Sequence, residues 1–360
     1  MNATRQLSRA GQSLWLDNIT RDLLTSGTLL RYIQELSITG LTSNPTIFNQ
    51  AIKGGTAYDD SIRERRRADK SAEDLFFALA LEDLTRAADL FRPTHERTAG
   101  VDGWVSLEVS PLLAHDAQAT LAQVKELHVR AARPNLYIKI PGTSAGLLAI
   151  EEAIFAGVPI NVTLLFSAEQ YAAAAEAYLR GVERRIEAGL NPNVASVASV
   201  FISRWDVAVA KAHKIPAALA NTLGVAVGKR AYGTYSRMIE SARCRRVLNA
   251  GARPQRLLFA STGTKDPKAS DILYIKELVA PFTVNTMPEA TLKAFADHGE
   301  FGSELTADGG DAERVLAEFH RAGVNVDALA AQLQDEGAAA FVASWNELLG
   351  VIASKVSSVV

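Results

Sequence analysis

The sequence predicts an α/β protein built as a (β/α)8 barrel, with additional helices after the second strand and at the carboxyl terminus. Short apolar runs alternate with amphipathic stretches, which is typical of βα units around a parallel sheet. We find eight such runs, the number that closes a barrel of this type. Nearly every run also carries a polar side chain near its carboxyl end, where barrel enzymes keep their active sites.

The predicted strands and the helices between them follow one another along the chain. The strands are expected at residues 13–18, 38–44, 104–109, 136–140, 160–166, 196–201, 256–261 and 282–286. Helical patterns lie at residues 21–36, 72–90, 112–131, 168–187, 206–222 and 232–248.

Two connections and the carboxyl-terminal tail are longer than a bare barrel requires. Residues 44–104 and 201–256 should each hold two or more helices, because structureless loops of that length are unusual. The tail has helical patterns at 311–322, 327–336 and 339–356, and it could lie across one mouth of the barrel. We therefore predict a catalytic barrel domain over residues 1–300 with a helical insertion at about 50–100. A helical extension should cover residues 301–360 and pack on the barrel.

Composition and charge restrict the class of protein. A chain of 360 residues with 48% hydrophobic content can bury a large core, and barrels of this length form one domain. The net charge of −2 gives no field that attracts nucleic acid or an anionic membrane. Cys244 is the single cysteine, which excludes an intramolecular disulfide. The sequence has neither a signal peptide nor a stretch near the roughly 20 apolar residues that cross a bilayer, so we expect a cytoplasmic protein. We expect it to be a monomer or a homodimer.

The fourth predicted strand contains a lysine among apolar residues. Leu136, Ile138 and Ile140 point to one side of an extended chain, and Tyr137 and Lys139 point to the other. Taken alone, this pattern fits an edge strand with a solvated lysine as well as it fits a lysine inside a barrel. In the second case the dry amine could form a Schiff base with a sugar ketone.

The other strands place polar side chains with the same alternation, which favours the lysine inside a barrel. The matching pairs are Trp15 with Asp17, Thr42 with Asn44, Ser106 with Glu108, Asn161 with Thr163, Ser199 with Phe201, Phe259 with Ser261, and Thr283 with Asn285. Because helices cover the outside of a barrel, the aliphatic set should face outward and this mixed set inward. Buried polar groups cost roughly several kcal/mol each unless they are paired or used, so their agreement indicates a site.

The residue types suggest the chemistry of that site. An amine, two carboxylates (Asp17 and Glu108) and two amides (Asn44 and Asn161) can form an imine, move protons and hold hydroxyl groups. Arg204 and the loop of residues 261–265, which ends in Lys265, offer cations and backbone N–H groups to a phosphate. Taken alone, such a motif is more often an ordinary loop. Its position after the seventh strand and before a helix expected near residue 268 favours a phosphate-binding site.

At these positions the chain resembles the transaldolases, which belong to the Schiff-base-forming class I aldolases. The motifs, in the family's order, are GLTSNP at 40–45, VSLEV at 105–109, YIKIP at 137–141, NVTLLFS at 161–167, FISR at 201–204 and ASTG at 260–263. The resemblance covers about residues 13–295. It implies a (β/α)8 fold and an enzyme of the non-oxidative pentose phosphate pathway. Such an enzyme transfers a dihydroxyacetone unit from sedoheptulose 7-phosphate or fructose 6-phosphate to glyceraldehyde 3-phosphate or erythrose 4-phosphate.

The resemblance also implies roles for single residues. Lys139 matches the Schiff-base lysine, Asp17 the base in carbon–carbon cleavage, and Glu108 an acid/base acting through a water that Thr163 helps to hold. The implied substrate-binding residues are Thr42, Asn44, Asn161, Ser199, Phe201, Arg204, Ser261 and Lys265. In its commonest form the family has an arginine where this chain has Gly263, and Lys265 is the candidate replacement.

Two other functions fit parts of this pattern. An enzyme resembling fructose 6-phosphate aldolase would share the lysine but release free dihydroxyacetone, and a non-catalytic barrel would bind a sugar phosphate without turnover. The six histidines show no metal-ligand spacing and no Gly-x-Gly-x-x-Gly follows a strand, so we expect neither a metal nor a cofactor.

Overall fold

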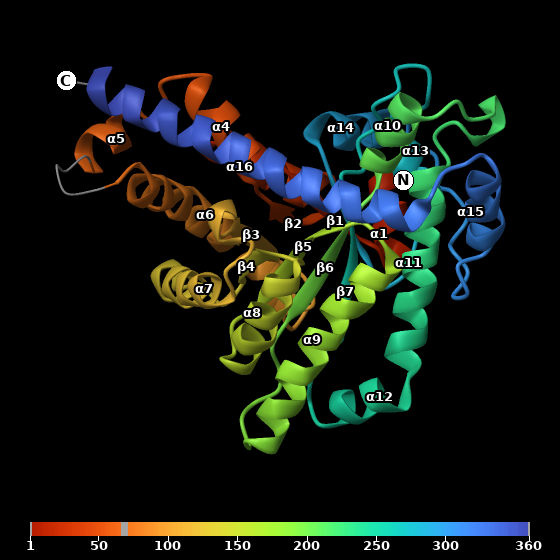
Figure 1. Ribbon diagram of the computed structural model, residues 1–360. Coiled ribbons are helices and arrows are strands. Elements are labelled where there is room, and N and C mark those ends of the chain that lie inside the picture. The colour runs from red at the N-terminus through yellow and green to blue at the C-terminus, as the bar shows by residue number, and fades with distance from the viewer. Residues whose placement is uncertain (1, 66–70, 359–360) are drawn as a thin grey trace.

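The computed structural model describes residues 2–65 and 71–358 of the chain. Eight parallel strands pair in sequence order and close into a barrel (Figure 1), which confirms the predicted fold class. The strands are β1 (Ser13–Asp17), β2 (Ile38–Thr42), β3 (Trp104–Glu108), β4 (Leu136–Pro141), β5 (Ile160–Leu165), β6 (Ser196–Phe201), β7 (Arg256–Ala260) and β8 (Val284–Met287). Each lies within about two residues of its expected position.

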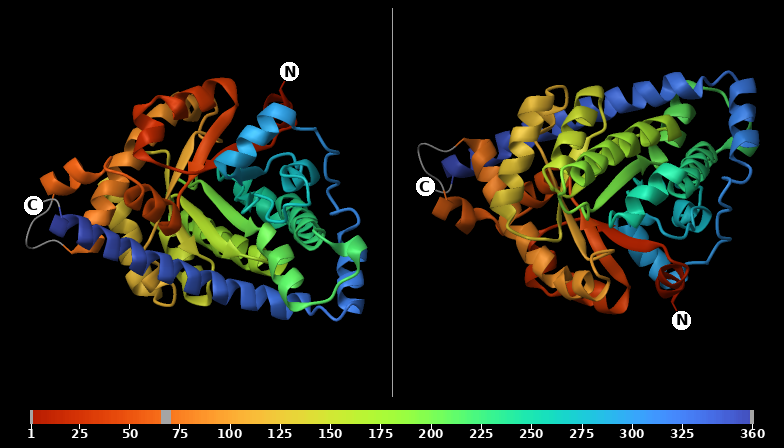
Figure 2. Two further views of the ribbon diagram at one scale, coloured as in Figure 1. Left: turned by 90° about the horizontal axis from the view of Figure 1, so that it is seen from above. Right: turned by 90° about the horizontal axis from the view of Figure 1, so that it is seen from below.

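Helices surround the barrel, as the views from above and below show (Figure 2). They are α1 (Ala3–Arg9), α2 (Arg21–Thr25), α3 (Thr28–Glu35), α4 (Pro45–Lys53), α5 (Asp59–Arg65), α6 (Ala72–Arg97), α7 (Ala117–Ala131), α8 (Ser144–Phe155), α9 (Ala168–Glu187), α10 (Ser203–Ala212), α11 (Leu223–Glu240), α12 (Ala242–Asn249), α13 (Leu273–Glu277), α14 (Glu289–His298), α15 (Ala312–Arg321) and α16 (Val326–Ser358). Two 3-10 turns, η1 (Pro111–Leu113) and η2 (Ala217–Leu219), complete the set. The division of the chain at residue 300 stays a prediction.

Several helical patterns are divided or joined differently from the expectation. The pattern at 21–36 is two helices, because Gly27 takes a left-handed φ of 72° between them. The patterns at 327–336 and 339–356 are one continuous helix, α16, which runs through Gly337 without a break. A glycine is needed there because a Cβ atom would crowd the neighbouring Leu164 side chain. The helix expected near residue 268 begins at Leu273.

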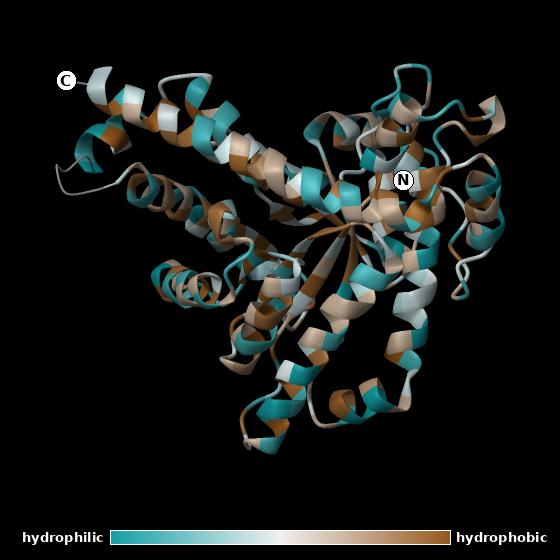
Figure 3. Ribbon diagram, in the orientation of Figure 1, coloured by the Kyte–Doolittle hydropathy of each residue, from teal (hydrophilic) through white to brown (hydrophobic). Residues whose placement is uncertain are grey.

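Helix α16 lies across the carboxyl-end mouth of the barrel (Figure 1) and packs most closely on α4 and α6. Trp345 is fully buried there, with its ring centroid 4.9 Å from that of Phe76 and 5.7 Å from that of Phe77. By length and composition α16 could cross a membrane, which corrects the expectation that no stretch approaches this limit. Its apolar residues include Leu348 and Ile352, which are buried against the protein, and polar residues alternate with them (Figure 3).

The strand register sets up the site. Glu108 of β3 is paired with Lys139 of β4, which in turn is paired with Asn161 of β5. On the first two strands, Asp17 is paired with Thr42. Because residues in register on parallel strands share a face, the side chains of each set point into the barrel together.

Asp206 of α10 supplies the cap that α11 lacks. Its carboxylate accepts hydrogen bonds from the backbone N–H groups of Leu223 (3.0 Å) and Gly224 (3.1 Å) and from the hydroxyl of Tyr274 (2.8 Å). Burial raises the pKa of Asp206 to about 6, although these hydrogen bonds oppose the shift.

This raised pKa predicts a pH-dependent contribution to stability. Below the ordinary pKa of 3.8 the carboxyl is protonated in both the folded and unfolded states. Between about pH 4 and 6 the folded state holds the proton more tightly, so the contribution of Asp206 to the free energy of unfolding falls by roughly 3 kcal/mol as pH rises. Urea unfolding of the wild type and Asp206→Asn at pH 4 to 7 should show a stability difference that shifts toward the variant over this interval. A difference that does not change with pH would contradict the assignment.

Candidate active site

The centre of the site is a buried ion pair between neighbouring strands. The Lys139 Nζ donates to Glu108 Oε2 at 3.0 Å and to the backbone carbonyl of Ser43 at 3.2 Å. Only 6% of the lysine side chain and 4% of the glutamate side chain are exposed. The solvated edge lysine is therefore wrong, because β4 pairs on both sides and Lys139 lies inside the barrel.

Asp17 lies at the carboxyl end of β1 and is held by the next strand. Thr42 donates from Oγ1 to Asp17 Oδ1 at 2.6 Å, and the same hydroxyl lies 2.8 Å from Thr286 Oγ1 on β8. Burial raises the pKa of Asp17, while the charge of Lys139 and the Thr42 hydrogen bond lower it. Burial likewise raises the pKa of Glu108, mainly against the charge of Lys139. Both carboxyls therefore hold a proton more readily than they would in water.

Asn161 ties the inner faces of three strands together behind Lys139. Its Nδ2 donates to Ser106 Oγ at 3.1 Å, and its Oδ1 accepts from Ser199 Oγ at 2.8 Å. In the described part of the chain, Thr163 Oγ1 and Glu108 Oε1 are buried without a hydrogen-bond partner. Such atoms usually find partners, so these two are available to a substrate group or a water.

A second cation enters the site from the start of α10. The Arg204 guanidinium carbon lies 5.1 Å from the ring centroid of Phe201, close enough for a cation–π contact. Burial lowers the pKa of Arg204, and the charges of Glu108 and Asp17 raise it. Arg204 thus brings a second positive charge to a site that already holds two carboxyls.

Helix α16 forms a roof over these residues. Gln334 Nε2 donates to the carbonyl of Leu164 at 2.9 Å and to that of Gly142 at 3.2 Å. Leu164 has a left-handed φ of 58° where the register of β5 shifts, which frees its carbonyl from the sheet ladder. The ring of Phe341, only 4% exposed, lies 5.8 Å from Lys139 Nζ and 5.9 Å from the Arg204 guanidinium carbon.

Most of the predicted residues line one small cavity of about 80 Å³ at this mouth. The lining residues are Asp17, Thr42, Asn44, Lys139, Thr163, Ser199, Phe201, Arg204, Ala260, Ser261, Thr286 and Phe341. Among the predicted residues, Glu108 and Asn161 lie behind this surface and reach it through Lys139 and Ser199. Over residues 2–65 and 71–358, no group of three or more His, Cys, Asp or Glu side chains could hold a metal ion.

The sequence pattern did not identify Thr286 and Phe341 as part of the site. The expected inward pair of β8, Thr283 with Asn285, is wrong, because the register pairs the inward-facing Trp15 with Thr286 and the outward-facing Leu14 with Asn285. Phe259 of β7 faces outward for the same reason, since it pairs with Val200 and not with an inward residue of β6. Phe341 lies far beyond the barrel in sequence. An apolar residue on a helix predicted to cross the mouth was the only available signal.

The loop after β7 differs from the expectation in one respect. A Cβ atom at Gly263 would lie 2.9 Å from Pro288 Cγ, so a longer side chain at this position would need Pro288 to move. Lys265 is exposed and does not line the cavity, but its charge is near enough to lower the pKa of Asp17. A cation therefore lies beside the mouth, although not at the position that Gly263 occupies.

Comparison with known proteins gives consistent matches over nearly the whole chain. The model of the family described as Transaldolase/Fructose-6-phosphate aldolase matches residues 14–352. A protein of Thermobifida fusca (strain YX) named Transaldolase is 44% identical over 361 aligned positions, which cover 98% of each chain. A protein with the same name from Thiobacillus denitrificans is 43% identical over 358 positions, covering 98% of this chain and 100% of its own length.

Proposed function

The chain belongs to the transaldolase/fructose-6-phosphate aldolase family, and we propose that it acts as a transaldolase through a Schiff base on Lys139. The observation that carries the assignment of Lys139 is its buried contact with Glu108 inside the closed barrel. The enzyme transfers a dihydroxyacetone unit from a ketose phosphate to an aldose phosphate, as expected for the non-oxidative pentose phosphate pathway. Cytoplasmic localisation and a monomeric or dimeric state stay predictions.

In the first step, the Lys139 amine must lose its proton before it can attack the ketone carbonyl. Glu108 is the acceptor, since its Oε2 lies 3.0 Å from Nζ. Burial raises the pKa of Glu108, which favours the protonated carboxyl that this transfer produces. The protonated Glu108 then returns a proton to the carbinolamine oxygen, which leaves as water when the imine forms. Glu108 Oε1 and Thr163 Oγ1, the two atoms without protein partners, orient that water.

In the second step, Asp17 removes the proton from the hydroxyl group on C4 of the ketose. The bond between C3 and C4 breaks, its electron pair moves through the imine carbon to nitrogen, and the aldose phosphate leaves. The remaining enamine of dihydroxyacetone adds to the aldehyde carbon of the acceptor, Asp17 returns the proton to the new hydroxyl, and water releases the product ketose. The raised pKa of Asp17 suits a base that must also act as an acid.

The remaining predicted residues bind the rest of the substrate. Asn44 accepts a backbone hydrogen bond from Ile47 through Oδ1 at 3.0 Å, which leaves its amide nitrogen for a sugar hydroxyl. Asn161 and Ser199 support the dihydroxyacetone end. Arg204 receives the phosphate, and the exposed Lys265 adds charge at the mouth.

The roof favours transfer over release of free dihydroxyacetone. Release requires protonation of the enamine carbon, a step that transfer does not need, whereas hydrolysis of the imine ends both reactions. A covered amine limits the access of water or another proton donor to that carbon. Phe341 covers the amine, and the cavity of about 80 Å³ is far smaller than the roughly 300–1,000 Å³ of typical ligand sites. We infer that α16 moves outward to admit substrate and returns before cleavage.

Two variants separate capture of the ketone from cleavage. Lys139→Met should lower kcat by roughly four orders of magnitude or more while the protein still folds, because it replaces a buried amine with an apolar side chain of similar length.

Asp17→Ala should lower kcat by roughly 10²–10⁴, yet still form an adduct that cyanoborohydride reduces and intact-protein mass spectrometry detects. Near-normal turnover of Lys139→Met, or no adduct in Asp17→Ala, would reject the respective role.

Lys265 can be tested through the charge of the substrate. Lys265→Ala should raise KM for fructose 6-phosphate by about two- to fivefold, which corresponds to the loss of one exposed ion contact. The increase should shrink at high salt, since exposed charges are screened. The exposed Lys268 on the same loop gives a matched control, and Lys268→Ala should leave KM unchanged. An unchanged KM for Lys265→Ala would show that this lysine does not contribute to binding of the phosphate.

Phe341 should control the ratio of transfer to release. With fructose 6-phosphate and no acceptor, Phe341→Ala should release free dihydroxyacetone faster than the wild type, whereas Phe341→Leu should lie between them. Both can be followed with a coupled assay for dihydroxyacetone. The control is Leu348→Ala, which removes a buried residue from the same helix away from the cavity and should not change the ratio. Equal ratios in all four proteins would show that the ring does not shield the enamine.

A further inference from the structure

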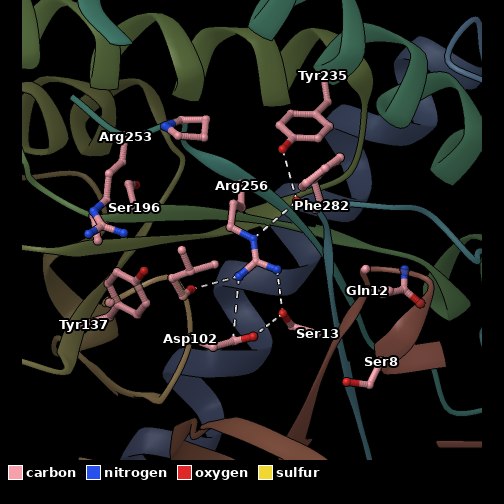
Figure 4. Close-up of a pocket in the computed structure, with 15 residues that line it drawn as sticks. Ser8, Gln12, Ser13, Asp102, Tyr137, Ser196, Tyr235, Arg253, Arg256 and Phe282 are labelled. Carbon is pink, nitrogen blue, oxygen red and sulfur yellow. Dashed lines mark hydrogen bonds and ion pairs between the residues drawn. The ribbon is translucent and has the colours of Figure 1, made fainter. Parts of the chain in front are cut away.

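A second cavity lies at the opposite, amino-terminal end of the barrel (Figure 4). Its volume of about 360 Å³ falls within the roughly 300–1,000 Å³ of small-molecule sites. Ser13, Tyr137, Ser196 and Arg256, from the beginnings of β1, β4, β6 and β7, line it at this end of the barrel. None of these residues has a part in the mechanism above.

The rim of this cavity exposes apolar side chains. Val101 is 50% exposed and Phe282 is 72% exposed, and the half-buried Pro254 also lines the cavity. Phe282 is held with a left-handed backbone by hydrogen bonds to its carbonyl from the Tyr235 hydroxyl (3.1 Å) and Arg256 Nε (3.3 Å). A single exposed apolar residue is ordinary, but two that face one cavity are typical of a binding site.

Inside the cavity, Tyr137 presents a hydroxyl without a protein partner. Its side chain is only 2% exposed and its ring stacks on Trp104, with ring centroids 4.1 Å apart. No hydrogen bond joins its hydroxyl to another group over residues 2–65 and 71–358. The hydroxyl oxygen is not one of the fully buried unpaired side-chain atoms of these residues, so it opens on the cavity and is available to a ligand that enters it.

The two arginines of the cavity differ in how fully they are used. Arg256 donates to the carbonyls of Phe282, Val101 and Thr283 and to Ser13 Oγ, and its guanidinium lies 3.7 Å from Asp102 (Figure 4). It therefore has one of its five N–H donors left and a carboxylate beside it, which marks a structural role.

Arg253 keeps most of its capacity for an anion. It donates through Nε to Asn193 and through Nη2 to the carbonyl of Ala99, which leaves three N–H donors. Among the described residues no carboxylate lies within ion-pair distance of it. Arg253 and Arg256 line the same cavity as Tyr137 (Figure 4). Burial raises the pKa of the Tyr137 hydroxyl, and the charges of Arg256 and Arg253 oppose that shift. With Asp102 the cavity carries a net charge of about +1.

We propose that this cavity is a second binding site, for a small aromatic monocarboxylate. The carboxylate lies against Arg253 and accepts from the Tyr137 hydroxyl, and the ring lies between Phe282 and Val101. One anionic group matches the single uncompensated charge, and a flat apolar body matches the rim. A sugar phosphate has hydroxyl groups on every face, and these would lose hydrogen bonds to water against the apolar side chains of the rim.

The test is titration calorimetry with benzoate, and with benzamide as a neutral molecule of the same shape. Benzoate should bind the wild-type protein saturably and more tightly than benzamide. Arg253→Gln and Tyr137→Phe should each weaken benzoate binding by about tenfold, as expected for hydrogen bonds to a charged carboxylate. Phe282→Ala should weaken both molecules, and this exposed ring can be removed without opening the core.

Two controls separate this site from the active site and from misfolding. Arg204→Gln, at the other end of the barrel, should leave benzoate binding unchanged, and inorganic phosphate should not compete with it. Tyr137→Phe should keep the melting temperature of the wild type, because the hydroxyl has no protein partner to lose. Absence of saturable binding at millimolar benzoate, equal binding of benzamide, or loss of binding in Arg204→Gln alone would each overturn the proposal.

Discussion

The contact between Lys139 and Glu108 depends on the register of β3 against β4, and the chemistry that we propose depends on that contact. A buried ion pair is favourable only when its remaining hydrogen bonds are satisfied, and the carbonyl of Ser43 supplies one of them. Since the two groups touch away from water, the proton can lie on the amine or on the carboxyl without charge entering the site. Asp17 and Arg204 add a second acidic and a second basic group to the site.

The long helix α16 connects this pair to the rest of the molecule. Trp345 anchors it in the aromatic cluster of α6, and Gln334 fastens it to the irregular end of β5 through Leu164. Between these two attachments, Gly337 lets the helix approach the barrel closely: an added Cβ would lie 3.0 Å from Leu164 Cδ2 and 3.3 Å from Arg204 Nη1. Phe341 is thereby held over the Lys139 amine. The same helix therefore provides stability at one end and water exclusion at the other.

The sequence allowed prediction of the barrel and of most residues in the site, because alternation along a strand determines which side chains face inward. Lys139, Asp17 and Thr163 follow this rule directly. It says nothing about contacts between inward-facing groups, so the engagement of Asn161 with Ser106 and Ser199 could not be foreseen. It also fails where the backbone is irregular, as before Thr286, and where a distant helix contributes, as with Phe341. In the sequence, Gly337 looks like a break between two helices. Its role is to allow close packing of α16 on the barrel, which a local pattern cannot show.

The central claim is that the Lys139 amine is the nucleophile that captures the ketone. The most direct measurement is borohydride reduction of the wild-type protein in the presence of fructose 6-phosphate, followed by peptide mass mapping. We expect one reduced adduct per chain, on the peptide that contains Lys139. An active protein that forms no adduct, or that carries it on another lysine, would show that Lys139 is not the nucleophile.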